Sequence, residues 1–177
     1  PASSPSARSY HAMTYDSVRG KVVMFGGYDS TSISGYVNDT WEYDCSDCAS
    51  IASYGSGCGS SYPLTLSSNA PTLGSVWHLS LLFAEWAPNY AFFFGDTLYN
   101  PGLDLGAGGA TGCFAYMNGN LGAVITGDFG FTSSITMPIP NLPQLIGYEF
   151  MVQGLTGSTS TPAGFVTSNG IKAVIGY

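Results

Sequence analysis

Residues 76–83 have the sequence VWHLSLLF, in which apolar and polar side chains alternate. A period of two is the pattern of a β-strand with one buried face. The apolar side of this segment carries Trp77, Leu79, Leu81 and Phe83, and the other side carries His78 and Ser80. A few residues later, YAFFFG at 90–95 is a short continuous apolar run, typical of a strand that is buried on both faces. The two segments predict the core of a β-sheet protein.

More short strand-like segments follow, separated by glycine, proline and asparagine. Ser168-Asn169-Gly170 lies between the last two of them, and Asn-Gly is a strong signal for a hairpin turn. No window has the 3.6-residue period of an amphipathic helix. We therefore predict an all-β fold, with an antiparallel β-sandwich or jelly roll over residues 49–177. The predicted strands are residues 112–117, 122–129, 132–139, 148–153, 164–167 and 171–175.

The N-terminal part contains three further candidate strands, RSYHAMTYD at 8–16, KVVMFGG at 21–27 and NDTWEYD at 38–44. Together they resemble three strands of a single kelch-like propeller blade, and the repeat does not recur. Where a usual kelch blade has its fourth strand, this chain has Cys45-Ser46-Asp47-Cys48. A blade cannot bury its faces alone, and propellers have typically 4–8 blades. We expect residues 1–48 to form an extended arm with an incomplete blade that needs a partner.

The composition excludes several classes of function. Charged residues make up 8% of the 177 residues, against about 25% in typical soluble proteins. The net charge is −7 with four basic residues, so the basic footprint needed for nucleic-acid binding is missing. No apolar run approaches the roughly 20 residues of a membrane span. The start has no signal-peptide pattern, and we expect Pro1 to be the processed end of a longer precursor.

Residues 54–177 resemble a C-terminal β-sandwich module that ends large secreted bacterial repeat and propeller proteins. The motifs that carry the resemblance, in order, are YGSGC at 54–58, PTLG at 71–74, FFFG at 92–95, LDL at 103–105, GC at 112–113, MPIP at 137–140, GYEFMVQ at 147–153 and SNG at 168–170. The resemblance implies an extracellular accessory module without catalytic residues. It also implies that Cys58 and Cys113 form a disulfide.

Cys45 and Cys48 are the other two cysteines. A local disulfide between them would use the even number of cysteines fully. The alternative is a four-thiolate zinc site, since Cys-x2-Cys is also a ligand spacing, although the chain has no second Cys-x2-Cys. Two disulfides would place the protein outside the cytosol, so we expect it to be extracellular or at the cell surface.

Other candidate site residues are few. His11 and His78 lie in predicted strands without the oriented partners of a catalytic triad, so we expect no enzyme and no cofactor.

Asp96, Asn100 and Asp104 share a loop with glycine and proline, and their oxygen atoms suit calcium. No fixed ligand pattern is present, and a role in turn formation explains these residues as well. Asn38 begins the sequon Asn-Asp-Thr and could accept a glycan, but it also belongs to the kelch-like pattern.

These observations predict a structural protein, a subunit of a filament or surface assembly joined by β-strand addition between neighbours. The core of the donated strand would be Val22, Val23, Met24 and Phe25. Self-association is the expected partnership. The alternative is a secreted glycan- or protein-binding accessory module cut from a larger propeller protein, because the chain is 14% aromatic and exposed aromatic rings can stack on sugars.

Overall fold

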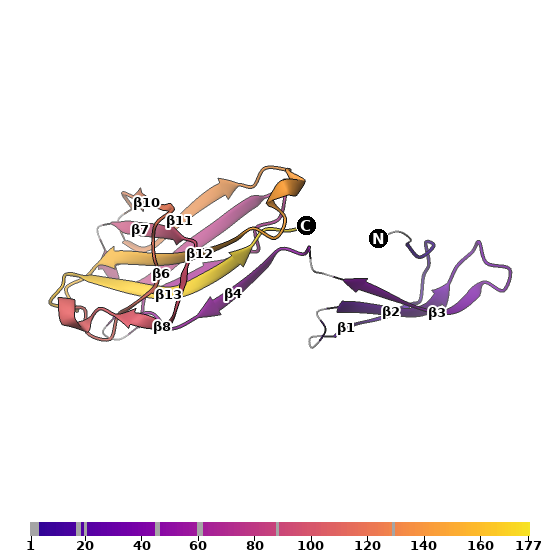
Figure 1. Ribbon diagram of the computed structural model, residues 1–177, viewed down its shortest axis with the longest axis horizontal. Coiled ribbons are helices and arrows are strands. Elements are labelled where there is room, and N and C mark those ends of the chain that lie inside the picture. The colour runs from indigo at the N-terminus through magenta and orange to yellow at the C-terminus, as the bar shows by residue number, and fades with distance from the viewer. Residues whose placement is uncertain are drawn as a thin grey trace. The chain divides into compact units, whose positions relative to one another are not determined.

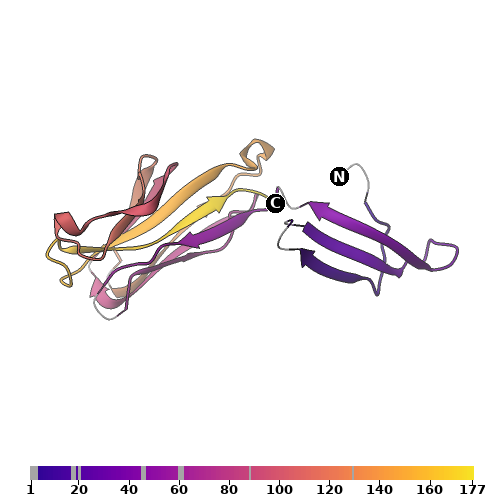
Figure 2. The ribbon, with the colours of Figure 1, turned by 60° about the horizontal axis from the view of Figure 1, so that its bottom comes forward.

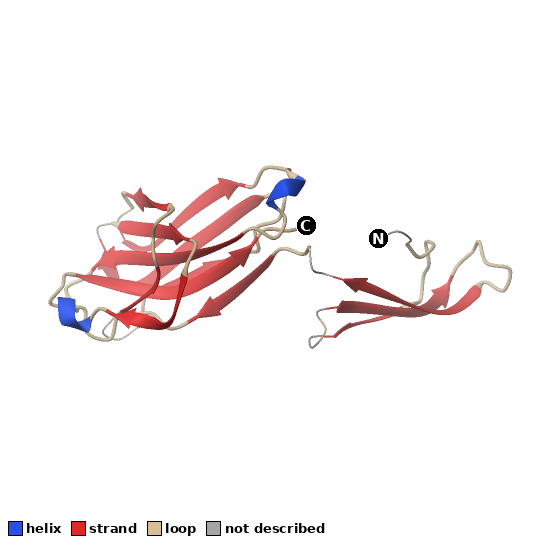
Figure 3. Cartoon of the chain, viewed as in Figure 1, coloured by secondary structure: helices blue, strands red, loops and turns tan. Residues whose placement is uncertain are grey.

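The computed structural model describes residues 4–16, 19, 21–44, 47–59, 62–87, 89–128 and 130–177, with the backbone alone described for 44 and 83–87. The chain divides into two compact units, Pro1–Asp47 and Cys48–Tyr177. Strands and loops make up nearly all of both units, and the helical elements described are two single 3-10 turns, η1 (Gly106–Gly108) and η2 (Pro143–Leu145) (Figure 3). The predicted all-β fold is confirmed.

The N-terminal unit contains one antiparallel sheet of three strands in the order β1-β2-β3 (Figure 2). The strands are β1 (Ala12–Asp16), β2 (Lys21–Tyr28) and β3 (Tyr36–Asp44). The β2–β3 register shifts between Phe25 and Gly27. Gly27 has a φ of 116°, and a Cβ there would lie 2.8 Å from the carbonyl oxygen of Ser9, so this position requires glycine.

The C-terminal unit is a β-sandwich of two antiparallel sheets (Figure 1). One sheet has five strands in the order β10-β7-β12-β13-β4, and the other has three in the order β11-β6-β5. A two-stranded sheet, β8 (Leu98–Asp104) with β9 (Phe114–Met117), completes the unit. The bounds of the other strands are β4 (Ser50–Tyr54), β5 (Thr65–Ser68), β6 (Val76–Ala87), β7 (Tyr90–Gly95), β10 (Gly122–Thr126), β11 (Gly130–Pro138), β12 (Glu149–Gly157) and β13 (Phe165–Val174).

The core of the sandwich follows the alternation seen in the sequence. Trp77, Leu79 and Leu81 of β6 are completely buried, as the period of two predicts. The Trp77 ring packs edge-on against Phe150 of β12, with 4.9 Å between ring centroids. Each large apolar side chain buried in this way stabilises the fold by about 1.5–3 kcal/mol relative to an exposed one. The hydrophobic core cluster of the described residues lies wholly in this unit.

The predicted hairpin turn at residues 168–170 is wrong. Strand β13 continues through them with a register shift: Thr167 pairs with Leu155 of β12, and Gly170 pairs with Gln153 of β12 and Tyr54 of β4. The Asn169 side chain accepts a hydrogen bond from the Leu66 N–H at 2.8 Å and donates one to the Leu66 carbonyl at 3.1 Å. A Cβ at Gly170 would lie 2.3 Å from Cε2 of Tyr54. Long-range contacts therefore account for both residues of the Asn-Gly pair, and no turn is formed.

Candidate functional site

The N-terminal sheet has two chemically different faces, because directly paired residues of antiparallel strands point to the same side. Met13 pairs with Met24, which pairs with Trp41, and Tyr15 pairs with Val22, which pairs with Tyr43. We call the side that these residues share the apolar face: Met13, Tyr15, Val22, Met24, Trp41 and Tyr43. Met13 and Tyr15 are 58% and 60% exposed.

We call the opposite side of the sheet the charged face, because ion pairs lie there beside the apolar side chains of Val23 and Phe25. Arg19 donates hydrogen bonds to Asp16 at 2.6 Å and to Glu42 at 2.9 Å. Lys21 donates to the same Glu42 carboxylate at 3.4 Å. Exposed ion pairs of this kind stabilise a fold little, and water satisfies them equally well. The ion pairs of the charged face therefore need no cover, while Phe25 on the same face is 54% exposed.

Among the described residues of the N-terminal unit, no second sheet or helix covers the apolar face. Met24 is the one buried hydrophobic residue among them. A sheet with an apolar face becomes stable by packing that face against another layer.

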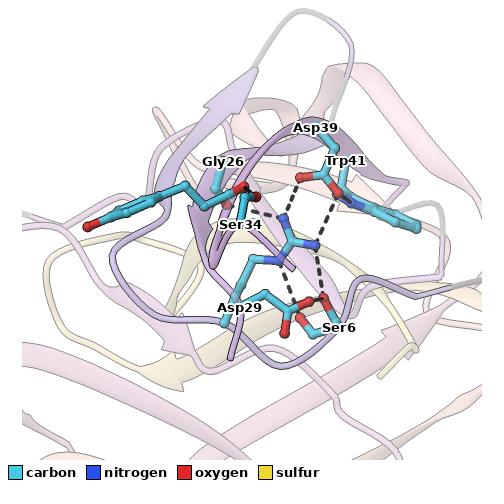
Figure 4. Close-up of polar contacts among 8 residues, drawn as sticks. Ser6, Gly26, Asp29, Ser34, Asp39 and Trp41 are labelled. Atoms are coloured by element: carbon cyan, nitrogen blue, oxygen red, sulfur yellow. Dashed lines mark hydrogen bonds and ion pairs between the residues drawn. The ribbon is translucent and has the colours of Figure 1, made fainter. Parts of the chain in front are cut away.

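One end of the apolar face is fixed by Arg8, whose side chain is only 4% exposed. Its guanidinium donates two hydrogen bonds to the Asp39 carboxylate, from Nη1 at 2.5 Å and from Nη2 at 3.1 Å. Nη1 also donates to the Gly26 carbonyl at 3.2 Å. The indole N–H of Trp41 donates to the same carboxylate at 2.7 Å (Figure 4). The network thus orients the Trp41 side chain through a bidentate ion pair.

A second carboxylate, that of Asp29, ties the N-terminal segment to the β2–β3 loop. Asp29 is 5% exposed and accepts hydrogen bonds from the N–H of Thr31 at 2.7 Å and from its hydroxyl at 2.6 Å. The Ser6 hydroxyl donates to the other oxygen of the same carboxylate (Figure 4). Ser6 and Arg8 therefore hold the segment before β1 in place.

These contacts predict an acid transition of the N-terminal unit. Hydrogen bonds from Arg8 and then Trp41 lower the pKa of Asp39 to about 2, and those from Ser6 and Thr31 lower the pKa of Asp29 to about 2, from 3.8. A carboxyl with a depressed pKa stabilises the fold above its unfolded value, and the contribution is lost as pH falls through the folded value. We expect stability of this unit to fall between about pH 4 and pH 2.

The amide NMR signals of β2 and β3 will report this transition, and Asp39→Asn should flatten it because that variant has no carboxyl to titrate at position 39. Asp104→Asn, in the C-terminal unit, is the control. An acid transition of unchanged steepness in Asp39→Asn would contradict the assignment.

The predicted donated strand, Val22 to Phe25, is the middle of β2. Its backbone is already paired on one side with β1 and on the other with β3. Its side chains divide between the two faces, with Val22 and Met24 on the apolar face and Val23 and Phe25 on the charged face. Among the described strands, the edges that this sheet leaves open are those of β1 and β3.

Cys58 and Cys113 form the predicted disulfide, which links residues 55 apart in the sequence. The bond joins the segment after β4 to the residue that precedes β9. Cys48 is not a free cysteine. Its predicted partner, Cys45, lies outside the described residues, so the Cys45–Cys48 pairing stays a prediction.

The candidate calcium ligands have hydrogen-bond partners of their own. The Asp96 carboxylate accepts hydrogen bonds from the side-chain amides of Asn120 at 2.9 Å and Asn118 at 2.7 Å, which lower its pKa to about 2. Asp104 accepts one from a backbone N–H two residues on, at 2.8 Å. In the described part of the chain, no three His, Cys, Asp or Glu residues are placed to hold a metal ion. Asn100, the third candidate, lines a pocket instead.

The remaining candidates lie apart from one another in the fold. Asn38 is exposed on β3 and is accessible to modification. His78 is exposed on β6, and its backbone N–H donates to the side-chain oxygen of Asn69 at 2.6 Å. His11 lies just before β1, and its Nδ1 is buried without a hydrogen-bond partner among the described residues.

An aromatic pocket of about 330 Å³ lies beside β8 in the C-terminal unit. The rings of Phe114 and Tyr116 stack with centroids 6.1 Å apart, and Tyr54 meets Tyr116 edge-on at 5.8 Å. Burial raises the pKa of Tyr54 to about 12, so it stays neutral. An uncharged, aromatic pocket can hold a flat apolar group or the apolar face of a sugar ring. Its lining is Tyr54, Gly55, Leu98, Tyr99, Asn100, Pro101, Gly102, Phe114 and Tyr116.

No protein-family model, curated protein or solved structure matches this chain. The resemblance to a kelch-like repeat and to a secreted C-terminal module therefore stays a prediction. None of the helices in the described residues is long and apolar enough to cross a membrane. What can be inferred about function depends on the geometry of the two units.

Proposed function

We propose that the chain is an extracellular structural subunit that assembles with copies of itself through its N-terminal sheet. The observation that carries the proposal is the apolar face, which has no second layer among the described residues of its own unit. In this assembly a strand of a second copy pairs with the open edge of β1 or β3, and the apolar face packs against that copy. Main-chain hydrogen bonds and apolar burial act together in this contact.

The charges and the disulfide support an assembled extracellular role. Arg8, Arg19, Lys21 and Lys172 are the four basic residues, and each is already in an ion pair within the chain. Charged residues are only 8% of the sequence, so close packing of subunits desolvates few charges. The Cys58–Cys113 disulfide is typical of proteins outside the cytosol.

Two neighbouring residues of β1 provide a matched test, because Thr14 and Tyr15 are both exposed but lie on opposite faces of the sheet. We expect wild-type protein to form large particles by light scattering and in negative-stain images. Tyr15→Lys should reduce these particles sharply, since it places a charge on the apolar face, and Thr14→Lys should leave them unchanged. The measurement compares both variants at equal concentration and neutral pH.

Equal loss of assembly in Tyr15→Lys and Thr14→Lys would contradict a role for the apolar face. A wild-type chain that stays a monomer of 18.5 kDa would contradict assembly altogether. The second result would favour the other candidate function, a secreted glycan-binding module, for which the aromatic pocket beside β8 is the supporting observation.

A further inference from the structure

The strand β10 forms an unprotected edge of the five-stranded sheet. It pairs with β7 on one side, without a register shift, and no other described strand pairs with it. Its sequence, GAVIT, has no charge and no proline, and Ile125 and Val124 are 73% and 40% exposed. Soluble proteins usually protect such edges with charges, prolines or bulges, because an open edge pairs with other chains.

Two of the other three edges of the sandwich, β5 and β11, carry features that β10 lacks, whereas the third, β4, has only a side-chain contact. The Leu66 backbone of β5 is occupied by the Asn169 side chain, and Ser53 of β4 accepts a hydrogen bond from the same amide at 2.8 Å. Strand β11 has a register shift between Gly130 and Thr132 and ends at a proline. Bulges and prolines both oppose the addition of a further strand.

We propose that β10 pairs antiparallel with β10 of a second copy of this chain, across a two-fold axis at Val124. The two five-stranded sheets then become one continuous sheet. This register places Val124 opposite Val124 of the second copy, Ala123 opposite Ile125, and Gly122 opposite Thr126. Each pair combines apolar or small side chains, and such cross-strand pairs stabilise a sheet.

The sequence around β10 favours a second copy as the occupant. Two copies of one strand pair antiparallel by a two-fold rotation, which gives the self-complementary contact that most homodimers use. The chain has a net charge of −7, but residues 121–127, LGAVITG, carry none of it. Two copies can therefore meet at β10 without placing like charges opposite one another.

This contact is independent of the proposed N-terminal assembly and closes a dimer by itself. The full chain with Tyr15→Lys, in which the N-terminal contact is weakened, isolates it for measurement. Ile125→Lys adds a charge at an exposed position of β10. Its matched control is Ala52→Lys on β4, at the opposite edge of the same sheet, where the side chain is also exposed.

Sedimentation velocity over a range of concentrations should show a monomer–dimer equilibrium for the Tyr15→Lys chain. Ile125→Lys should raise its dissociation constant by about tenfold or more, and Ala52→Lys should not change it. A Tyr15→Lys chain that is monomeric at every concentration overturns the proposal, as does equal dimerisation of the Ile125→Lys variant. Failure of Tyr15→Lys to reduce large particles would instead count against the N-terminal assembly, and the Ile125→Lys and Ala52→Lys comparison still tests β10.

A second measurement tests the register and does not require a charge in the strand. In the proposed dimer the Val124 side chains face each other at a Cβ separation of about 4.5–5.5 Å, whereas the two Ile125 residues are diagonal neighbours about 7–8 Å apart. Cysteines more than about 7 Å apart between Cα atoms do not form a disulfide without backbone movement. Val124→Cys should therefore form dimers on a non-reducing gel after mild oxidation, and Ile125→Cys should not. Equal cross-linking of both variants, or none in Val124→Cys, overturns the register.

Discussion

Replacing Cys58 and Cys113 together with alanine will lower the free energy of unfolding of the C-terminal unit by about 4 kcal/mol. The disulfide links residues 55 apart, and a loop of this length in the unfolded chain loses much conformational entropy when it is closed. In the folded unit, Cys113 is completely buried and Cys58 is 7% exposed, so reductants reach neither sulfur easily. The measurement is urea denaturation followed by circular dichroism.

The control is wild-type protein unfolded and measured with a reductant present throughout. It retains both cysteine side chains, so a shift of the same size assigns the effect to the bond and not to lost packing. A double variant within about 1 kcal/mol of wild type would contradict the loop-closure explanation.

Asn169→Leu will destabilise the same unit by about 2–5 kcal/mol, because it leaves the N–H and the carbonyl of Leu66 without hydrogen bonds. Leu66 and Asn169 are 3% and 7% exposed, so water cannot easily replace the lost partners. The side-chain amide of Asn169 acts here as a neighbouring strand would, meeting both backbone groups of a single residue. The expected result is a lower urea midpoint with an unchanged slope.

Ser53→Ala is the matched control for Asn169→Leu. The Ser53 hydroxyl also contacts the Asn169 amide, at 2.8 Å, but Ser53 is exposed and water can take its place. We expect a loss below about 1 kcal/mol. Similar losses in both variants would show that the contact to Leu66 is not the important one.

The sequence predicts the buried strands of this fold well and the short or irregular ones poorly. Trp77, Leu79 and Leu81 indicate β6 because its period depends only on local alternation. Strands β4 and β5, with the sequences SIASY and TLSS, are too short and serine-rich for such a signal. Strand β8 contains Asn100 and Pro101, which suggest a turn by composition, but here the cis peptide bond between them lies within the strand.

The contacts that shape the N-terminal sheet have a weaker sequence signal. In a chain with four basic residues, each can be expected to find a carboxylate, but sequence does not say which one. Asp39 is the partner of Arg8 because the meander brings residues 31 apart together. The alternation along β2 separates Val22 and Met24 from Val23 and Phe25, but all four are apolar, so β2 alone does not indicate which face carries the charges.

The Asn169 side chain also bears on how the protein ages. In an Asn-Gly pair the glycine nitrogen can attack the side-chain carbon of the asparagine, a slow reaction that ends in aspartate or isoaspartate. In β13 the amide of Asn169 is held against Leu66 and Ser53 by three hydrogen bonds, away from that attack. Folding thus shields this Asn-Gly pair, which is one of two in the chain, the other being Asn118-Gly119. An unfolded chain lacks these three hydrogen bonds, so Asn169 is open to this reaction whenever β13 is unfolded.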